Sequence, residues 1–125
     1  MRRRPDERSL RATSRRERED AAVRLAEAVP DLASLAIDVR EHRPGQSVAE
    51  AAYVRRVVVP TAPALFLVPC GDPACRDGEH DLTHELLAEL RRGATRVEGE
   101  DGCHGTAGAV PCQRVLRWTA VASYR

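Results

Sequence analysis

The chain has 125 residues, the length of one ordinary domain, and carries a formal net charge of +1. Hydrophobic residues make up 42% of it, but 19 of them are Ala and only 3% of the chain is aromatic. No stretch approaches the roughly 18 consecutive apolar residues of a membrane-spanning helix, which excludes that class of protein. The core must be built with little aromatic bulk, so we expect the four cysteines to supplement it.

The charge is distributed unevenly along the chain. Residues 1–18 contain eight Arg and three acidic residues, a net of +5, whereas the remainder contains 12 Arg and 16 acidic residues, a net of −4. Leu10 is the only large apolar residue of the first segment after the initiating Met. Such a segment cannot bury enough surface to offset its ordering entropy. We therefore expect residues 1–18 to be a disordered Arg-rich arm, either a solubilising tail or a contact to nucleic acid.

The cellular compartment determines what the cysteines can do. No apolar segment follows the first arginines, as a secretory signal would require, so we expect a cytoplasmic protein with no membrane association. All 20 basic residues are Arg and there is no Lys, a bias typical of GC-rich coding sequences and of a small bacterial protein. In a reducing cytosol, four cysteines favour metal binding or redox chemistry over structural disulfides.

The first half of the chain predicts one helix and three strands. Apolar residues at three- and four-residue steps indicate a helix over residues 16–29, which ends before a proline. Residues 35–40 alternate as a half-buried strand does, and a turn follows at residues 44–45. A second strand is predicted over the β-branched residues 52–59. Residues 64–68 are wholly apolar, so we place this third strand at the centre of the sheet.

The second half predicts a helix between two further strands. Leucines recur every four residues from residue 82 to residue 90, and Gly93 stands where a left-handed residue ends a helix. A short strand is expected over residues 94–99, and the alternating residues 112–124 form the last strand. Residues 19–125 thus read as a single α+β domain. We expect about five mainly antiparallel strands with one or two helices packed on one face.

The four cysteines form two pairs, each in a turn-rich loop beside an expected strand: Cys70 and Cys75 in residues 69–80, Cys103 and Cys112 in residues 100–112. If residues 64–68 and 113–124 are antiparallel neighbours, both loops emerge at one end of the sheet. Four thiolates could then surround a zinc ion, which takes tetrahedral sulfur ligands at about 2.3 Å. His80, five residues after Cys75, is the reserve ligand.

Two resemblances follow from this arrangement. A strand followed by a cysteine loop, repeated across residues 64–118, resembles a zinc ribbon in the broad sense, although ribbons carry Cys-x2-Cys and neither pair here does. That resemblance implies a structural zinc site at one end of the sheet. The order of cysteine loop, helix, strand and second cysteine loop is similar to thioredoxin-like ferredoxins, which implies a two-iron cluster as the alternative cofactor.

The sequence therefore predicts a small metal-binding protein with structural zinc, acting as an interaction or regulatory module with a protein partner. We expect no catalytic residues, because the zinc-enzyme motifs His-x-Glu with Cys-x2-Cys and His-Glu-x2-His are both absent. An iron–sulfur or dithiol redox protein is the first alternative. The second is a nucleic-acid-binding accessory protein that uses residues 1–18.

Overall fold

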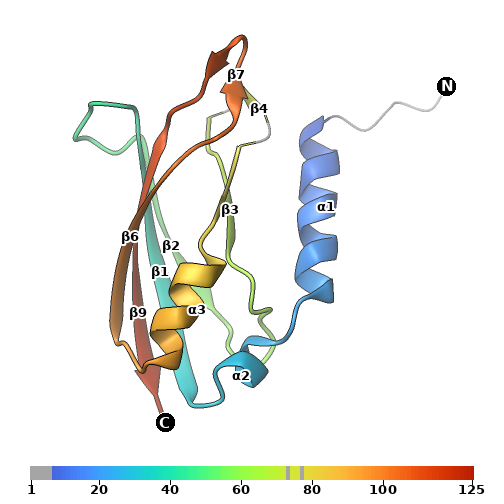
Figure 1. The fold of residues 1–125 in the computed structure, drawn as a ribbon, viewed down its shortest axis with the longest axis vertical. Coiled ribbons are helices and arrows are strands. Elements are labelled where there is room, and N and C mark those ends of the chain that lie inside the picture. The colour runs from blue at the N-terminus through green and yellow to red at the C-terminus, as the bar shows by residue number, and fades with distance from the viewer. Residues whose placement is uncertain (1–6, 73, 77) are drawn as a thin grey trace, which may run out of the picture.

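An antiparallel sheet of four strands organises the computed structural model, which describes residues 7–125 except 73 and 77 (Figure 1). Its strand order is β2 (Ala51–Val57), β1 (Leu32–His42), β9 (Val115–Tyr124) and β6 (Arg96–Gly102). The expected α+β class and antiparallel pairing are confirmed, and the alternation in β9 gives one buried face. The expected fifth strand of this sheet is not found among the described residues.

Placing residues 64–68 at the centre of the sheet was wrong. Part of this run belongs to β3 (Leu67–Pro69), which pairs with β5 (Glu79–Asp81) in a separate two-stranded sheet. Phe66 and Val68 are nevertheless buried, because this segment packs across the inner face of the main sheet as part of its core. A wholly apolar run looks the same in either position, so the pattern could not distinguish them.

A third, small sheet stands at the upper end of the molecule in Figure 1 and carries two of the expected loops. It consists of two-residue strands in the order β4 (Cys75–Arg76), β7 (Thr106–Ala107) and β8 (Val110–Pro111). Residues 69–80 and 100–112 are therefore not plain loops, because both contain short paired strands. Strands of this length have little stability of their own.

Two helices close the core on one face of the main sheet. Leu25 in α2 (Leu25–Ala28) and Leu86 in α3 (Thr83–Arg91) are fully buried and belong to the same core cluster as the inner face of the sheet. The α3 helix ends as predicted, with Gly93 at a φ of +81°. Helices packed on one face are thus confirmed.

The expectation of a disordered arm was wrong for the residues described, because α1 spans Glu7–Ala21; residues 1–6 lie outside the described part. Arg, Glu and Ala are good helix formers, which favours a helix even without an apolar face. Arg18 donates two hydrogen bonds of 2.9 Å to the carboxylate of Glu79, and Arg15 lies 3.7 Å from it. A partner 61 residues away therefore helps to order this segment.

The single helix expected over residues 16–29 is interrupted. Between α1 and α2, the amide of Leu25 donates to the carbonyl of Ala62, and the amide of Ala64 donates to the carbonyl of Val23. Arg24 accordingly has an extended backbone. Tertiary hydrogen bonds here replace the intrahelical ones, which the periodicity of the sequence could not reveal.

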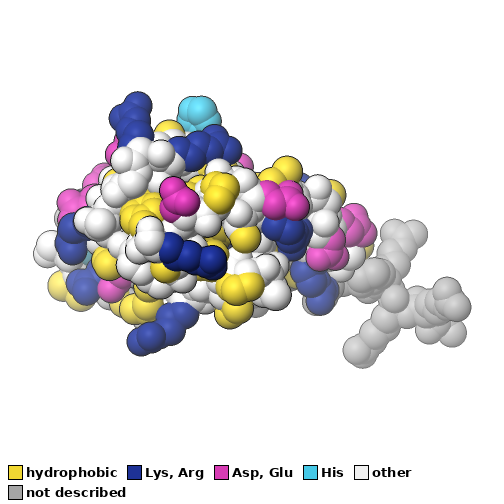
Figure 2. Space-filling view, turned by 90° about the horizontal axis from the view of Figure 1, so that it is seen from below, with side chains coloured by type: hydrophobic (Ala, Val, Ile, Leu, Met, Phe, Trp, Pro, Cys, Tyr) yellow, Lys and Arg dark blue, Asp and Glu magenta, His cyan; other side chains and the backbone are white. Residues whose placement is uncertain are grey.

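The surface away from the small sheet is mixed in character. Figure 2 views the molecule from the end opposite the small sheet, and it shows acidic and basic side chains interspersed, with hydrophobic ones in small groups. In the described part of the chain, every helix is too short or too polar to cross a bilayer.

Candidate metal centre

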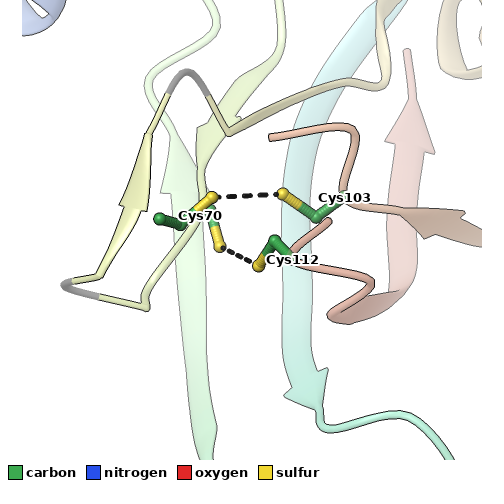
Figure 3. Close-up of side chains that lie close together, drawn as sticks. Cys70, Cys103 and Cys112 are labelled. Carbon is green, nitrogen blue, oxygen red and sulfur yellow. Dashed lines mark hydrogen bonds between the residues drawn. The ribbon is translucent and has the colours of Figure 1, made fainter. Parts of the chain in front are cut away.

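Pairing between two short strands brings the cysteine segments together. Strand β6 ends and β9 begins at the same end of the main sheet, where Gly102 pairs with Val115. Cys103 and Cys112 lie between these strands and flank the hairpin of β7 and β8. Strand β4 then pairs with β7, with Cys75 opposite Ala107. The two cysteine pairs consequently meet at this end, as Figure 3 shows for Cys70, Cys103 and Cys112.

The route to this convergence differs from the expected one. Residues 64–68 are not hydrogen-bonded neighbours of the last strand, which lies between β1 and β6. The segment instead crosses the inner face and reaches the same end, where the amide of Cys70 donates to the carbonyl of Gly78. The clustering of the four cysteines was predicted correctly from a premise that was wrong.

The spacing of the four sulfurs is compact enough to hold one metal ion. All four Sγ atoms lie within 4.8 Å of one another. Cys70 Sγ is 3.8 Å from Cys112 Sγ, and Cys75 Sγ is 3.6 Å from Cys103 Sγ. A tetrahedron of sulfurs about 2.3 Å from a central ion has edges of about 3.8 Å. All four cysteines are free thiols, since these distances exceed a disulfide bond of about 2.05 Å.

Glycines make room for the sulfurs. A Cβ atom on Gly78 would lie 2.5 Å from Cys75 Sγ and 2.8 Å from Cys103 Sγ. A Cβ atom on Gly105 would lie 2.6 Å from Cys75 Sγ, and the amide of Gly105 donates to Cys103 Sγ at 3.4 Å. The backbone can approach the cluster this closely only because neither residue has a side chain.

Burial divides the cluster into two kinds of thiol. Cys75 and Cys103 are 5% and 6% exposed, whereas Cys70 and Cys112 are half-buried. Burial raises the pKa of Cys70 well above its usual range and the pKa of Cys75 to about 12. Burial opposes ionisation of Cys112 as well, but the Arg114 backbone and the other thiols hydrogen-bond to it and lower its pKa. A bound cation would displace protons from these thiols, so metal binding and proton release are coupled.

His80, the reserve ligand, is not part of the sulfur cluster. It is fully buried, and its Nδ1 lies 2.9 Å from Asp101 Oδ2. This hydrogen bond gives a buried histidine a structural partner, and the clustered ligand atoms come from cysteines alone.

Two buried charged residues near the cluster, Glu41 and Arg114, were missed by the sequence reasoning. Glu41 is only 2% exposed, and its Oε1 accepts a hydrogen bond of 3.0 Å from the amide of Gly71, next to Cys70. Arg114 Nε lies 4.0 Å from its other oxygen and Arg114 Nη2 lies 2.9 Å from Glu50. The alternation of residues 35, 37 and 39 places residue 41 on the same inner face, so the signal was present.

A groove of about 750 Å³ adjoins the cluster. Its lining includes residues of α1, of β2 and of the segment from Pro69 to Glu79, among them Arg11, Tyr53 and Cys70. Cys70 and Cys75 both line this groove, so the cysteine cluster borders a space that α1 also borders.

Comparison with models of known protein families, with curated proteins and with solved structures finds no match for this chain.

Proposed function

We propose that Cys70, Cys75, Cys103 and Cys112 bind one zinc ion in a closed structural site, and that the protein is an interaction or regulatory module. The observation that carries the proposal is the set of sulfur–sulfur distances, all within 4.8 Å, with two at 3.6 and 3.8 Å. The distances of 3.6 and 3.8 Å correspond to the edge of about 3.8 Å in a tetrahedron of four thiolates around zinc.

The compact spacing favours a single ion over an iron–sulfur cluster. In a two-iron cluster each iron binds two cysteine sulfurs and bridging sulfides separate the irons, so thiolates on different irons must stand further apart than the ligands of one ion. The four sulfurs here all lie within 4.8 Å of one another. The redox alternative with a two-iron cluster would need these segments to move apart.

The ligand set favours a structural role. Catalytic zinc sites have three protein ligands and keep a fourth position open for water or substrate. Four thiolates would fill the tetrahedral coordination sphere and leave no position for water. The side chains of Cys75 and Cys103 are also nearly buried. We therefore assign the metal to folding and not to catalysis.

A bound metal would stabilise the short strands that surround the cysteines. Strands β4, β7 and β8 have two residues each, and they hold the end of the molecule at which the cysteines meet. Structural zinc contributes about 10–16 kcal/mol in zinc-finger peptides, which matches the total stability of about 5–15 kcal/mol of a typical domain. The groove beside α1 is then a preformed surface for a protein partner. Binding of nucleic acid by residues 1–18 stays a prediction.

Metal analysis of the purified protein tests the proposal. We expect one zinc per chain in protein purified anaerobically under reducing conditions, and we expect a strong chelator to lower the melting temperature until zinc is restored. Iron with labile sulfide would establish the redox alternative instead. A chain that retains no metal, and whose melting temperature zinc does not raise, would refute the assignment.

A further inference from the structure

We propose that Cys70 and Cys112 form a peroxide-sensitive pair, whose oxidation to a disulfide releases the zinc while Cys75 and Cys103 remain reduced. This inference rests on the proposed zinc site and deepens it, because it makes metal binding responsive to an oxidant. Cys70 and Cys112 would then react with the oxidant, whereas Cys75 and Cys103 would stay reduced.

Distance alone does not separate the two pairs. Both connect the Cys70–Cys75 segment with the Cys103–Cys112 segment, at 3.8 and 3.6 Å. Each must shorten by roughly 1.6–1.8 Å to reach a disulfide bond length of about 2.05 Å. What differs between them is access and the freedom of the sulfurs to move.

Access favours the pair of Cys70 and Cys112. Both are half-buried, whereas Cys75 and Cys103 are 5% and 6% exposed. Cys70 also lines the groove beside α1, whose volume of about 750 Å³ far exceeds that of a small oxidant. Cys75 borders the same groove, but its low exposure leaves little of it in contact with solvent.

Packing restrains the other pair. The backbone at Gly78 and Gly105 lies so close to Cys75 Sγ that no side chain fits between them, and the amide of Gly105 hydrogen-bonds to Cys103 Sγ. Cys75 is also fixed within β4, whereas Cys70, Cys103 and Cys112 lie outside the strands. Backbone hydrogen bonds from Asp72 and Arg114 also reach Cys70 and Cys112. The sulfur contacts below 3 Å that a Cβ on these glycines would make, however, fall on Cys75 and Cys103. The sulfurs of Cys70 and Cys112 therefore have more room to approach each other.

The reaction needs only hydrogen peroxide as co-reactant. A thiolate of the pair attacks one peroxide oxygen, so that an S–O bond forms, the O–O bond breaks and hydroxide leaves. The second thiolate attacks the resulting sulfenic sulfur, so that the S–S bond forms, the S–O bond breaks and a second hydroxide leaves. The two sulfurs together lose two electrons to the peroxide, and both hydroxides take up protons to become water. Only the thiolates of Cys75 and Cys103 would then be left to hold a zinc ion, so the zinc would be released.

Oxidation of the full-length zinc-loaded protein tests this directly. Metal content is measured first, and hydrogen peroxide is then added in increasing amounts while a chromogenic chelator reports free zinc. At half release, differential thiol alkylation and tandem mass spectrometry identify the oxidised residues. We expect a Cys70–Cys112 disulfide in equal amount to the released zinc, with Cys75 and Cys103 still alkylated, and recovery on adding a thiol reductant and zinc.

Two kinds of result would overturn the inference. One is a first disulfide that contains Cys75 or Cys103, and the other is zinc release with sulfinic acid and no disulfide. Retention of zinc at peroxide levels that oxidise free cysteine would also overturn it. The metal content before oxidation decides the zinc assignment separately, so the two proposals can fail independently.

Discussion

Replacing Gly105 by alanine tests whether the backbone must pack directly on the sulfurs. The new Cβ would lie 2.4 Å from the carbonyl oxygen of Arg76, 2.6 Å from Cys75 Sγ and 2.7 Å from the amide nitrogen of Gly78. Ordinary contacts of a Cβ begin at 3.4 Å, so backbone and sulfur must retreat by as much as 1.0 Å. Two of these atoms belong to the backbone and the third is a sulfur of the cluster, so the strain falls on the cluster itself.

The magnitude follows from the cost of overpacking. Inserting a methyl group into a well-packed site costs about 1–3 kcal/mol. Because each 1.4 kcal/mol corresponds to a factor of ten, zinc should bind about 5- to 150-fold more weakly to Gly105→Ala. Gly102→Ala is the matched control, since a Cβ at Gly102 meets nothing within 4 Å and its φ is not positive. The control should bind zinc as the unaltered protein does.

A competition titration measures the difference. Zinc is titrated into each protein in the presence of a chromogenic chelator of known affinity, and circular dichroism of the zinc-loaded forms checks that each variant folds. We expect a loss of affinity for Gly105→Ala alone. Equal affinities for all three proteins, or an equal loss in both variants, would refute it.

Three further substitutions test the parts of the fold that position the centre. Glu79→Gln weakens the partly exposed ion pairs to α1, each worth about 0.2–1 kcal/mol. Hydrogen exchange in α1 should therefore accelerate while the metal content is unchanged, and unaltered exchange would contradict the docking of this helix. Gly99→Ala places a Cβ 2.3 Å from the indole of Trp118 and should lower the free energy of unfolding by about 1–3 kcal/mol. The melting temperature should fall accordingly, and an unchanged value would show that the contact is not tight. Leu86→Ala removes a fully buried side chain and should cost about 2–5 kcal/mol in urea denaturation; a loss below about 1 kcal/mol would contradict its place in the core.

Local patterns in the sequence identified the elements with regular periodicity. The alternation of residues 112–124 predicted the last strand, which the structure places as β9 over Val115–Tyr124. The leucines of α3 and the left-handed Gly93 fixed that helix to within a residue or two. In these cases the buried face and the helix end depend on side chains that are close together in the chain, so the sequence carries the information.

Elements that depend on distant partners were not predictable in the same way. Helix α1 is paired with Glu79, and the gap before α2 is occupied by hydrogen bonds to residues 62–64. The apolar run 64–68 is buried against the sheet and not within it. Neither charge runs nor hydrophobicity record such pairings, because they arise from tertiary packing.

The candidate site could be predicted from the sequence only in part. The number of cysteines and their position in turn-rich loops predicted a cluster, and the structure brings all four sulfurs within 4.8 Å. The strand pairing that achieves this, between β4 and β7, involves two residues on each side and left no pattern in the sequence. Glu41 could have been found by extending the alternation of β1 by one step, since it shares the buried face with Val39.

X-ray absorption at the zinc edge of the purified protein tests the central claim most directly, because it reports the number, kind and distance of the ligands. Coordination by Cys70, Cys75, Cys103 and Cys112 predicts a shell of four sulfurs at about 2.3 Å and no nitrogen or oxygen ligand. A shell that contains nitrogen or oxygen, or fewer than four sulfurs, would contradict the closed four-cysteine centre.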